Sequence, residues 1–279
     1  MNATLLFSQE LSTKYGKITT DELKMTSCSL DSTANAVVIY KKGKTQYEYK
    51  DGFRIKHEIE TKIKILTHEG TSYANVIIPY YNESSVNGMK ENVSQIEGYA
   101  FNLENGKIVK TKLEKDFITK ERINDKYMQV KFSIPNVKAG TVIEYKYEYL
   151  SDFYHLLEDW EMQQDIPVLY GEYDLSIPNY YRFNMSTWGV HKIDYTTSSK
   201  TMHAEVKSGH LGTVSNSVRV PVTNYVFTAK ELPPLKDESY LWCADDYRTK
   251  VNFELLGIQF PGSEFKPFTN TWEDVDNTL

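Results

Sequence analysis

The stretch that most constrains the fold is residues 53–66, "FRIKHEIETKIKIL", where apolar and charged residues alternate. A period of two residues predicts a β-strand with one face in a core and the other in water. We therefore expect Ile59→Asp to cost several kcal/mol and Lys62→Asp to cost under about 1 kcal/mol. The core face is expected to carry Ile55, Ile59, Ile63 and Ile65, and the wet face Lys56, Glu60 and Lys64.

Similar patterns recur along most of the chain. The preceding "NAVVIYKKGKTQYEYKDG" predicts a strand, a turn at Gly43 and a second strand that ends at Asp51-Gly52. Asn105-Gly106 lies between two apolar runs and predicts a hairpin. With the antiparallel pair expected in residues 127–150 and the short strands that follow, the sequence predicts an all-β fold, a large antiparallel β-sandwich of Ig-like or supersandwich type.

The last residues break this pattern. In "TNTWEDVDNTL", Asn270 and Glu273 have the spacing of a capping box and predict the start of a short C-terminal helix. Helix signals are nearly absent before it. "KVNFELLGI" predicts one more strand. We divide the chain into an N-terminal extension (1–30), a β-sandwich domain (31–234) and a C-terminal strand and linker (235–279), whose residues 269–279 are expected to be loosely held.

Composition argues against several partners. The net charge of -6 and the pI near 5.6 disfavour nucleic-acid binding, and no apolar run reaches the roughly 18 residues of a membrane span.

The start "MNATLLFSQ" lacks the pattern of a signal peptide, although the sequence is compatible with one that has been removed. Cys28 and Cys243 have no zinc-site spacing, and whether they form a disulfide stays open.

Three features suggest chemistry, and each has a plainer explanation. His191, His203 and His210 have no acids or thiols nearby at ligand spacing, so no metal or cofactor is expected. Cys243 is followed by no histidine, which argues against a papain-type centre. Acids crowd around Trp160, but adjacent strand residues point to opposite faces, so Glu158 and Asp159 are not expected to line one cleft.

Several segments, taken in order, resemble a known family. They are "NAVVIYKKG", "KIKILTHEG", "NVIIPY", "FNLENGKIVK", "KFSIPNVKAGTVIEYKY", "WEMQQDIPVLYGEYDLSIP", "AKELPPLKDE", "DDYRTKVNFEL" and "TWEDV". Together they resemble the domain of unknown function that precedes transglutaminase-like domains in bacterial envelope proteins. The resemblance implies an exported, periplasmic or envelope protein whose Cys, His and Asp centre lies downstream of "TWEDV", and it makes Trp160, Ile166, Pro167 and Val168 framework residues.

The resulting functional hypothesis is a noncatalytic β-sandwich module that supports or presents substrate to a downstream transglutaminase-like or protease-like domain of the same chain. The alternative is a carbohydrate-binding module, because exposed aromatic rings stack on sugars. No catalytic residue is assigned. The candidate contacts to a protein or glycan ligand, or to the next domain, are Trp160, Trp188, Trp242 and Trp272.

Overall fold

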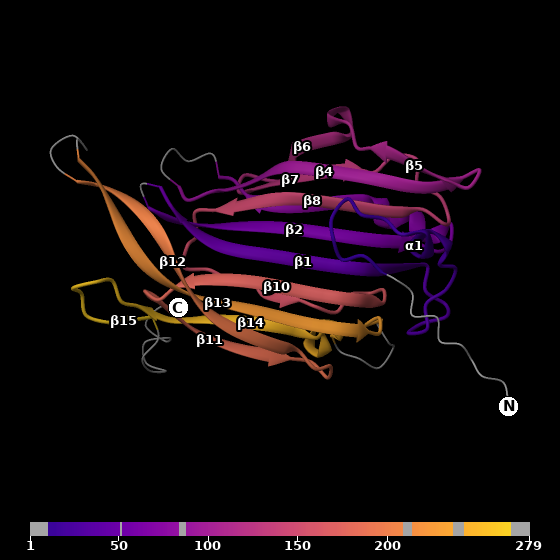
Figure 1. The fold of residues 1–279 in the computed structure, drawn as a ribbon. Helices are drawn as coiled ribbons and strands as arrows, with labels where there is room; N and C mark the ends of the chain where they lie inside the picture. Colours follow the sequence, from indigo (N-terminus) through magenta and orange to yellow (C-terminus); the bar gives the residue numbers. More distant parts are fainter. Residues whose placement is uncertain (1–10, 51, 84–87, 209–213, 237–242, 269–279) are drawn as a thin grey trace.

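The computed structural model describes residues 11–50, 52–83, 88–208, 214–236 and 243–268 (Figure 1). Strands dominate, as the sequence predicts. The helices are α1 (Thr20–Lys24) and 3-10 turns at Glu69–Ala74, Lys115–Phe117 and Ala244–Tyr247. The strands are β1 (Ala36–Tyr49), β2 (Phe53–Ile65), β3 (Asn75–Tyr81), β4 (Glu91–Glu104), β5 (Lys107–Lys112), β6 (Ile118–Arg122), β7 (Tyr127–Ser133), β8 (Val142–Ser151), β9 (Trp160–Glu161), β10 (Val168–Pro178), β11 (Tyr181–Trp188), β12 (Asp194–Ser208), β13 (Val214–Leu232), β14 (Lys250–Ile258) and β15 (Lys266–Pro267).

The largest sheet has the strand order β12-β13-β10-β1-β2-β8-β4-β5. Among the described strands, all neighbours in it are antiparallel except β1 and β10, which run parallel. That pair also joins two consecutive stretches of chain: β1, β2, β4, β5 and β8 come from residues 36–151, and β10, β12 and β13 from residues 168–232. The predicted antiparallel sandwich is therefore confirmed with one parallel seam (Figure 1).

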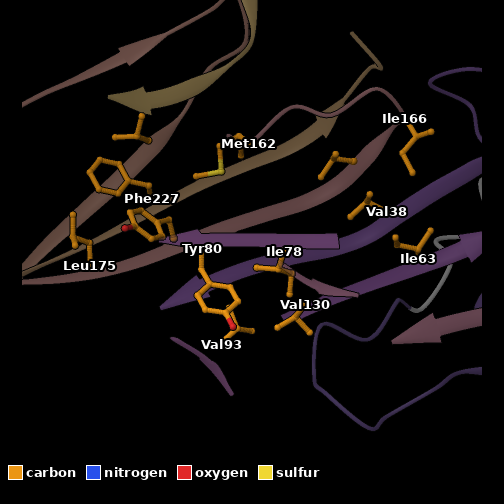
Figure 2. Packing of buried hydrophobic residues seen from close by; sticks show 14 of the residues in the cluster. Val38, Ile63, Ile78, Tyr80, Val93, Val130, Met162, Ile166, Leu175 and Phe227 are labelled. Atoms are coloured by element: carbon orange, nitrogen blue, oxygen red, sulfur yellow. The ribbon is translucent and has the colours of Figure 1, made fainter. Parts of the chain in front are cut away.

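Two smaller sheets supply the second layer. One has the order β3-β7-β6, and in the other β14 pairs with β11, β15 and β9. Their apolar residues join one buried cluster with those of the large sheet, and Figure 2 shows Ile78 and Val130 of the three-stranded sheet near Ile63 of the large sheet. This shared core fixes both small sheets on the same face.

The N-terminal segment covers the opposite face of the large sheet. Its short helix α1 has a reciprocal capping box, in which Thr19 Oγ1 accepts from the Glu22 backbone N–H (3.1 Å) and the Glu22 carboxylate accepts from that of Thr19 (2.9 Å). Leu23 packs there in a second buried cluster with Tyr40 and Val142. The sequence contains this T-x-x-E signal, which we did not predict as a helix. The proposed division at residue 30 stays a prediction.

Two lysines of β2 contradict the predicted wet face. The Lys62 ammonium is fully buried, donates to Ser12 O and Lys17 O at 2.8 Å, and lies 3.5 and 3.7 Å from the Glu22 and Glu144 carboxylates. Lys64 is also fully buried and donates to backbone carbonyls. The expectation that Lys64 faces water, and that Lys62→Asp is nearly harmless, is wrong because the N-terminal segment covers this face.

The predicted turn at Gly43 is also wrong. β1 runs without interruption from Ala36 to Tyr49 and pairs with β2 on one side and β10 on the other. A Cβ atom at Gly43 would lie 2.4 Å from Cη2 of Trp160. Glycine is therefore needed here for the close approach of an aromatic ring, which is the other common reason for a glycine within a strand.

Other predictions have clearer outcomes. Asn105 and Gly106 both have positive φ and close the hairpin between β4 and β5, as predicted. β14 forms where "KVNFELLGI" predicts a strand. Cys28 and Cys243 are free thiols. In the described ranges, no helix is long and apolar enough to cross a membrane. The predicted helix start at Asn270 lies outside the described residues.

Candidate binding groove

A groove lies on the core side of the large sheet, between two walls. One wall is β3, and the other is the connection 158–166 that leads into β10. It consists of two adjoining hollows of about 400 and 480 Å³, a size typical of ligand pockets. Figure 2 shows Ile78 of one wall and Ile166 of the other on the side of the sheet that carries Val38. Both hollows are lined by Lys41, Ile59, Ile77, Ile78 and Tyr147.

Trp160 anchors the second wall. Its ring stacks on Tyr173 at 4.7 Å with an interplanar angle of 5°, in the space left by the absent side chain of Gly43. Because its neighbours fix it this tightly, Trp160 is a framework residue and also lines the groove. This agrees with the role that the resemblance implies for it.

Lys41 supplies the cation of the groove. Its Nζ lies 4.8 Å from the Trp160 ring centroid and donates to Glu161 O at 3.2 Å. Burial lowers the pKa of Lys41 to about 8, opposed by the nearby Glu161 carboxylate. The amine is therefore mostly protonated at neutral pH and is a donor suited to a carbonyl or carboxylate oxygen.

His57 lies at the end of a short hydrogen-bond chain. Tyr173 donates its hydroxyl proton to Thr45 Oγ1 (2.9 Å), and Thr45 Oγ1 lies 2.7 Å from His57 Nδ1. Because Thr45 accepts from Tyr173, its own proton is available to Nδ1, which leaves the imidazole proton on Nε2. Burial lowers the pKa of His57 to about 4, so the ring is neutral at pH 7. It is a fixed neutral donor and a poor base.

The acids near the groove differ in their partners. Asp159 is ion-paired with Lys250 at 2.9 Å. Glu91, behind Tyr149, accepts from the Tyr149 hydroxyl at 2.5 Å, from Ser151 and from a backbone N–H. Glu158 is exposed to solvent at the rim of the groove, and within the described residues its carboxylate has no ion-pair or hydrogen-bond partner. Desolvation and the charges of Glu91 and Asp159 raise the pKa of Glu158.

Glu158 and Asp159 nevertheless both line the groove, contrary to the expectation from strand geometry. The reason is local: the chain from 157 to 159 is not a strand, so the alternation of faces does not apply. In the described part of the chain, no group of three or more His, Cys, Asp or Glu residues is arranged to hold a metal ion.

Among the described residues, no strand pairs with the edge of β3 that faces away from β7. In the antiparallel ladder between β3 and β7, every second residue of β3 bonds to β7. The bonds from Ile134 N to Ala74 O and from Asn82 N to Lys126 O, at the two ends of the ladder, identify these residues. Residues 76, 78 and 80 therefore bond to β7, and residues 75, 77, 79 and 81 point outward.

Three of the four outward positions have no free N–H. That of Asn75 bonds to Ser72 O, Pro79 has none, and that of Tyr81 bonds to Glu91. Ile77 retains its N–H, and its side chain is 57% exposed.

Trp160 and Trp188, the two predicted contact tryptophans within the described residues, do not come together. Cross-strand pairing places Trp160 opposite Val251 and Trp188 opposite Lys250, adjacent residues of β14 whose side chains point to opposite faces. Trp188 is 52% exposed and donates to Asp246 O. Trp242 and Trp272 lie outside the described residues. Lys41, His57 and the β3 edge were not predicted as parts of a site. The glycine at position 43 was the available sequence signal for the Trp160 ring that packs against it.

Comparison with known proteins gives a family and a fold. The profile of a family described as a domain of unknown function with a solved structure (DUF3857) matches residues 53–211, more than half of the chain. A crystal structure of a "putative protease" from Parabacteroides distasonis is similar, with a TM-score of 0.54 and 14% identity over 78% of this chain and 40% of that one.

An M1 zinc metallopeptidase from Deinococcus radiodurans also matches, with a TM-score of 0.29 and 7% identity over 70% of this chain and 42% of that one. The first likeness concerns the fold alone, and the second is too weak to support an argument. The chain spans less than half the length of each of these two proteins. No curated protein matches it.

Proposed function

The chain belongs to the DUF3857 family, and we propose that its β-sandwich is a noncatalytic module that holds and presents substrate to a transglutaminase-like or protease-like domain of the same exported bacterial protein. The periplasm or cell envelope is the proposed location. The observation that carries the proposal is the groove, which combines a strand edge and a carboxylate that have no partner among the described residues with an ammonium donor.

The groove has the chemistry of a binding site. Lys41 and the neutral His57 offer hydrogen-bond donors to a ligand's carbonyl groups, and Ile59 and Tyr147 offer apolar surface. The fixed, neutral state of His57 favours holding a ligand over general base catalysis, because a pKa of about 4 lies far below neutral pH.

Two observations support the proposed link to a transglutaminase-like or protease-like domain. The fold is shared with a protein called a "putative protease", of which this chain covers 40%. The sequence segments also resemble the module that precedes transglutaminase-like domains. Trp188, with Trp242 and Trp272, is proposed as a contact surface for the neighbouring domain, and the division into residues 31–234 and 235–279 is proposed with it.

The alternative, a carbohydrate-binding module, is less well supported. A sugar-binding platform needs aromatic faces presented to solvent. Trp160 stacks on buried Tyr173 and has the Lys41 ammonium near its ring, and Trp188 points to the other side of its sheet.

The test uses the parent protein, after its reading frame downstream of Leu279 has been determined. Ile59→Trp fills the groove from its floor, and Ile108→Trp, at a 45% exposed position on β5, is the matched control. We expect Ile59→Trp to lower kcat/KM for a long polypeptide by about tenfold or more and to leave a small chromogenic substrate unaffected. A parent protein without such a domain, or equal values for both variants, would refute the proposal.

A further inference from the structure

On the basis of this proposed function, we propose that the groove binds an extended polypeptide as an additional strand along the edge of β3, with a lysine or arginine side chain beside Glu158. This assigns a ligand class to the site: an unfolded or loop segment that carries a basic residue.

The edge of β3 is only partly protected against an added strand. Natural sheet edges are commonly protected by charged side chains or by a proline. β3 reads "NVIIPYY", which has no charge, so Pro79 is its one protecting residue, and the side chain of Ile77 is exposed. Pro79 points its nitrogen outward, where it costs the sheet no hydrogen bond but removes a donor from the free edge.

The backbone groups along this edge can bond to an added strand. The outward carbonyls of Asn75, Ile77 and Pro79 are acceptors, and the N–H of Ile77 is the remaining donor among these three residues. An added strand can therefore donate N–H groups at three alternate positions and accept one bond. Strand addition of this kind obtains affinity from main-chain bonds and specificity from alternate side chains.

The charges around the groove favour a basic side chain in the ligand. The side chains of an added strand that lie opposite Val76 and Ile78 point to the groove floor, as those two residues do. Next to that floor stands the unpaired Glu158 carboxylate, with the Glu91 carboxylate nearby. Lys41 is held on the Trp160 ring and on Glu161 O. A ligand ammonium or guanidinium beside Glu158 would pair with an acid that lacks a partner and reduce its repulsion with Glu91.

The binding test uses the 279-residue chain alone and a defined probe, the blocked heptapeptide acetyl-Thr-Val-Thr-Lys-Thr-Val-Thr-amide. Affinity is measured by calorimetry, and amide hydrogen exchange is followed by NMR. The Ile77 N–H should exchange rapidly in the free protein and become protected when the peptide binds. Because the lysine fixes which face meets the floor, N-methylation of one alternate set of peptide amides should abolish binding, and N-methylation of the other set should not.

Two pairs of variants separate the edge from the charge. Ile77→Pro removes the outward donor without breaking the ladder to β7 and should weaken binding about tenfold, whereas Ile77→Ala keeps the N–H and should have a smaller effect. Glu158→Gln should weaken the lysine peptide about tenfold and leave a glutamine version unchanged. Glu104→Gln, at an acid on β4 that pairs with Lys138 outside the groove, is its control.

Each outcome is decisive. Absence of binding, an unprotected Ile77 amide in the complex, or equal effects of the two methylation sets would overturn strand addition. Equal affinity for the lysine and glutamine peptides would overturn the basic anchor. If the peptide binds as described but Ile59→Trp leaves turnover by the parent unchanged, the proposed function fails and strand addition stands. The opposite pair of results retains the function and rejects this ligand.

Discussion

The contact between Gly43 and Trp160 gives the sharpest prediction about stability. A Cβ atom at position 43 would lie 2.4, 2.6 and 2.9 Å from three ring carbons of Trp160, well inside van der Waals contact. The ring cannot retreat easily, because it stacks on Tyr173, which is itself buried in the core. We expect the Gly43→Ala protein to be less stable than the wild type.

The magnitude follows from two opposing effects. Overpacking of a core typically costs about 1–3 kcal/mol. Alanine within a strand regains about 0.5–1 kcal/mol relative to glycine through chain entropy. The net loss should be about 1–2 kcal/mol, which is a fall in Tm of about 2–8 °C for a chain of this size.

A double-mutant cycle tests the cause. In a Trp160→Ala background the ring is gone, so Gly43→Ala should become neutral or stabilising by about 0.5 kcal/mol. Urea unfolding followed by circular dichroism gives all four free energies of unfolding. If Gly43→Ala is at least as stable as the wild type, or costs the same in both backgrounds, the steric reasoning is refuted.

Three further predictions concern charge and activity. Lys62→Ala leaves Glu22 and Glu144 buried without their cation and should lower the free energy of unfolding by about 3–5 kcal/mol. Lys56→Ala, at a partly exposed ion pair, should lower it by under about 1 kcal/mol. Equal Tm values for the two variants would contradict this. Burial lowers the pKa of Lys64 to about 8, below its unfolded value of 10.5, so the unfolded chain binds more protons between these values and stability should rise with pH from about 8. Above about pH 10 it should fall, because burial raises the pKa of many tyrosines. A Tm that declines between about pH 8 and 10 would contradict the first sign, and a Tm that still rises above about pH 10 would contradict the second. Finally, the 279-residue chain alone should turn over neither peptides nor polysaccharides, and activity that survives purification and is lost on mutating Glu158 would disprove a purely binding role.

The sequence predicted much of the fold because local signals agree with it. Alternation placed β2, and Asn105-Gly106 placed the hairpin between β4 and β5. Prediction from the sequence failed where a segment far away in the chain determines whether a side chain is buried. Alternation identifies two faces of β2 but not that residues 11–25 cover the second one, so Lys64 was assigned to water. Likewise a glycine in a strand-like run reads as a turn until its contact with Trp160 is known.

The groove was less predictable than the fold. Its floor brings together β1, β2 and β8, and its walls come from β3 and a connection some 80 residues later. Glu158 was noticed as part of an acidic stretch, but its lack of a partner depends on long-range packing. The free edge of β3 cannot be inferred from the sequence of β3, because it depends on the finding that no other described strand pairs with it on that side.

The parallel pairing of β1 with β10 has a consequence for the order of folding. Strands β1 to β8 lie within residues 36–151 and can pair with one another before the rest of the chain is available, but β10 reaches β1 only across more than 100 residues. Such non-local contacts form late, because their loop-closure entropy is paid before they stabilise anything. In Figure 1 this seam runs down the middle of the large sheet. Lys41 and Gly43 pair with β10 at this seam, and Trp160 is held over it. The groove should therefore be among the last features to form, so a nascent chain would offer the β3 edge before the opposite wall exists to restrict what binds there.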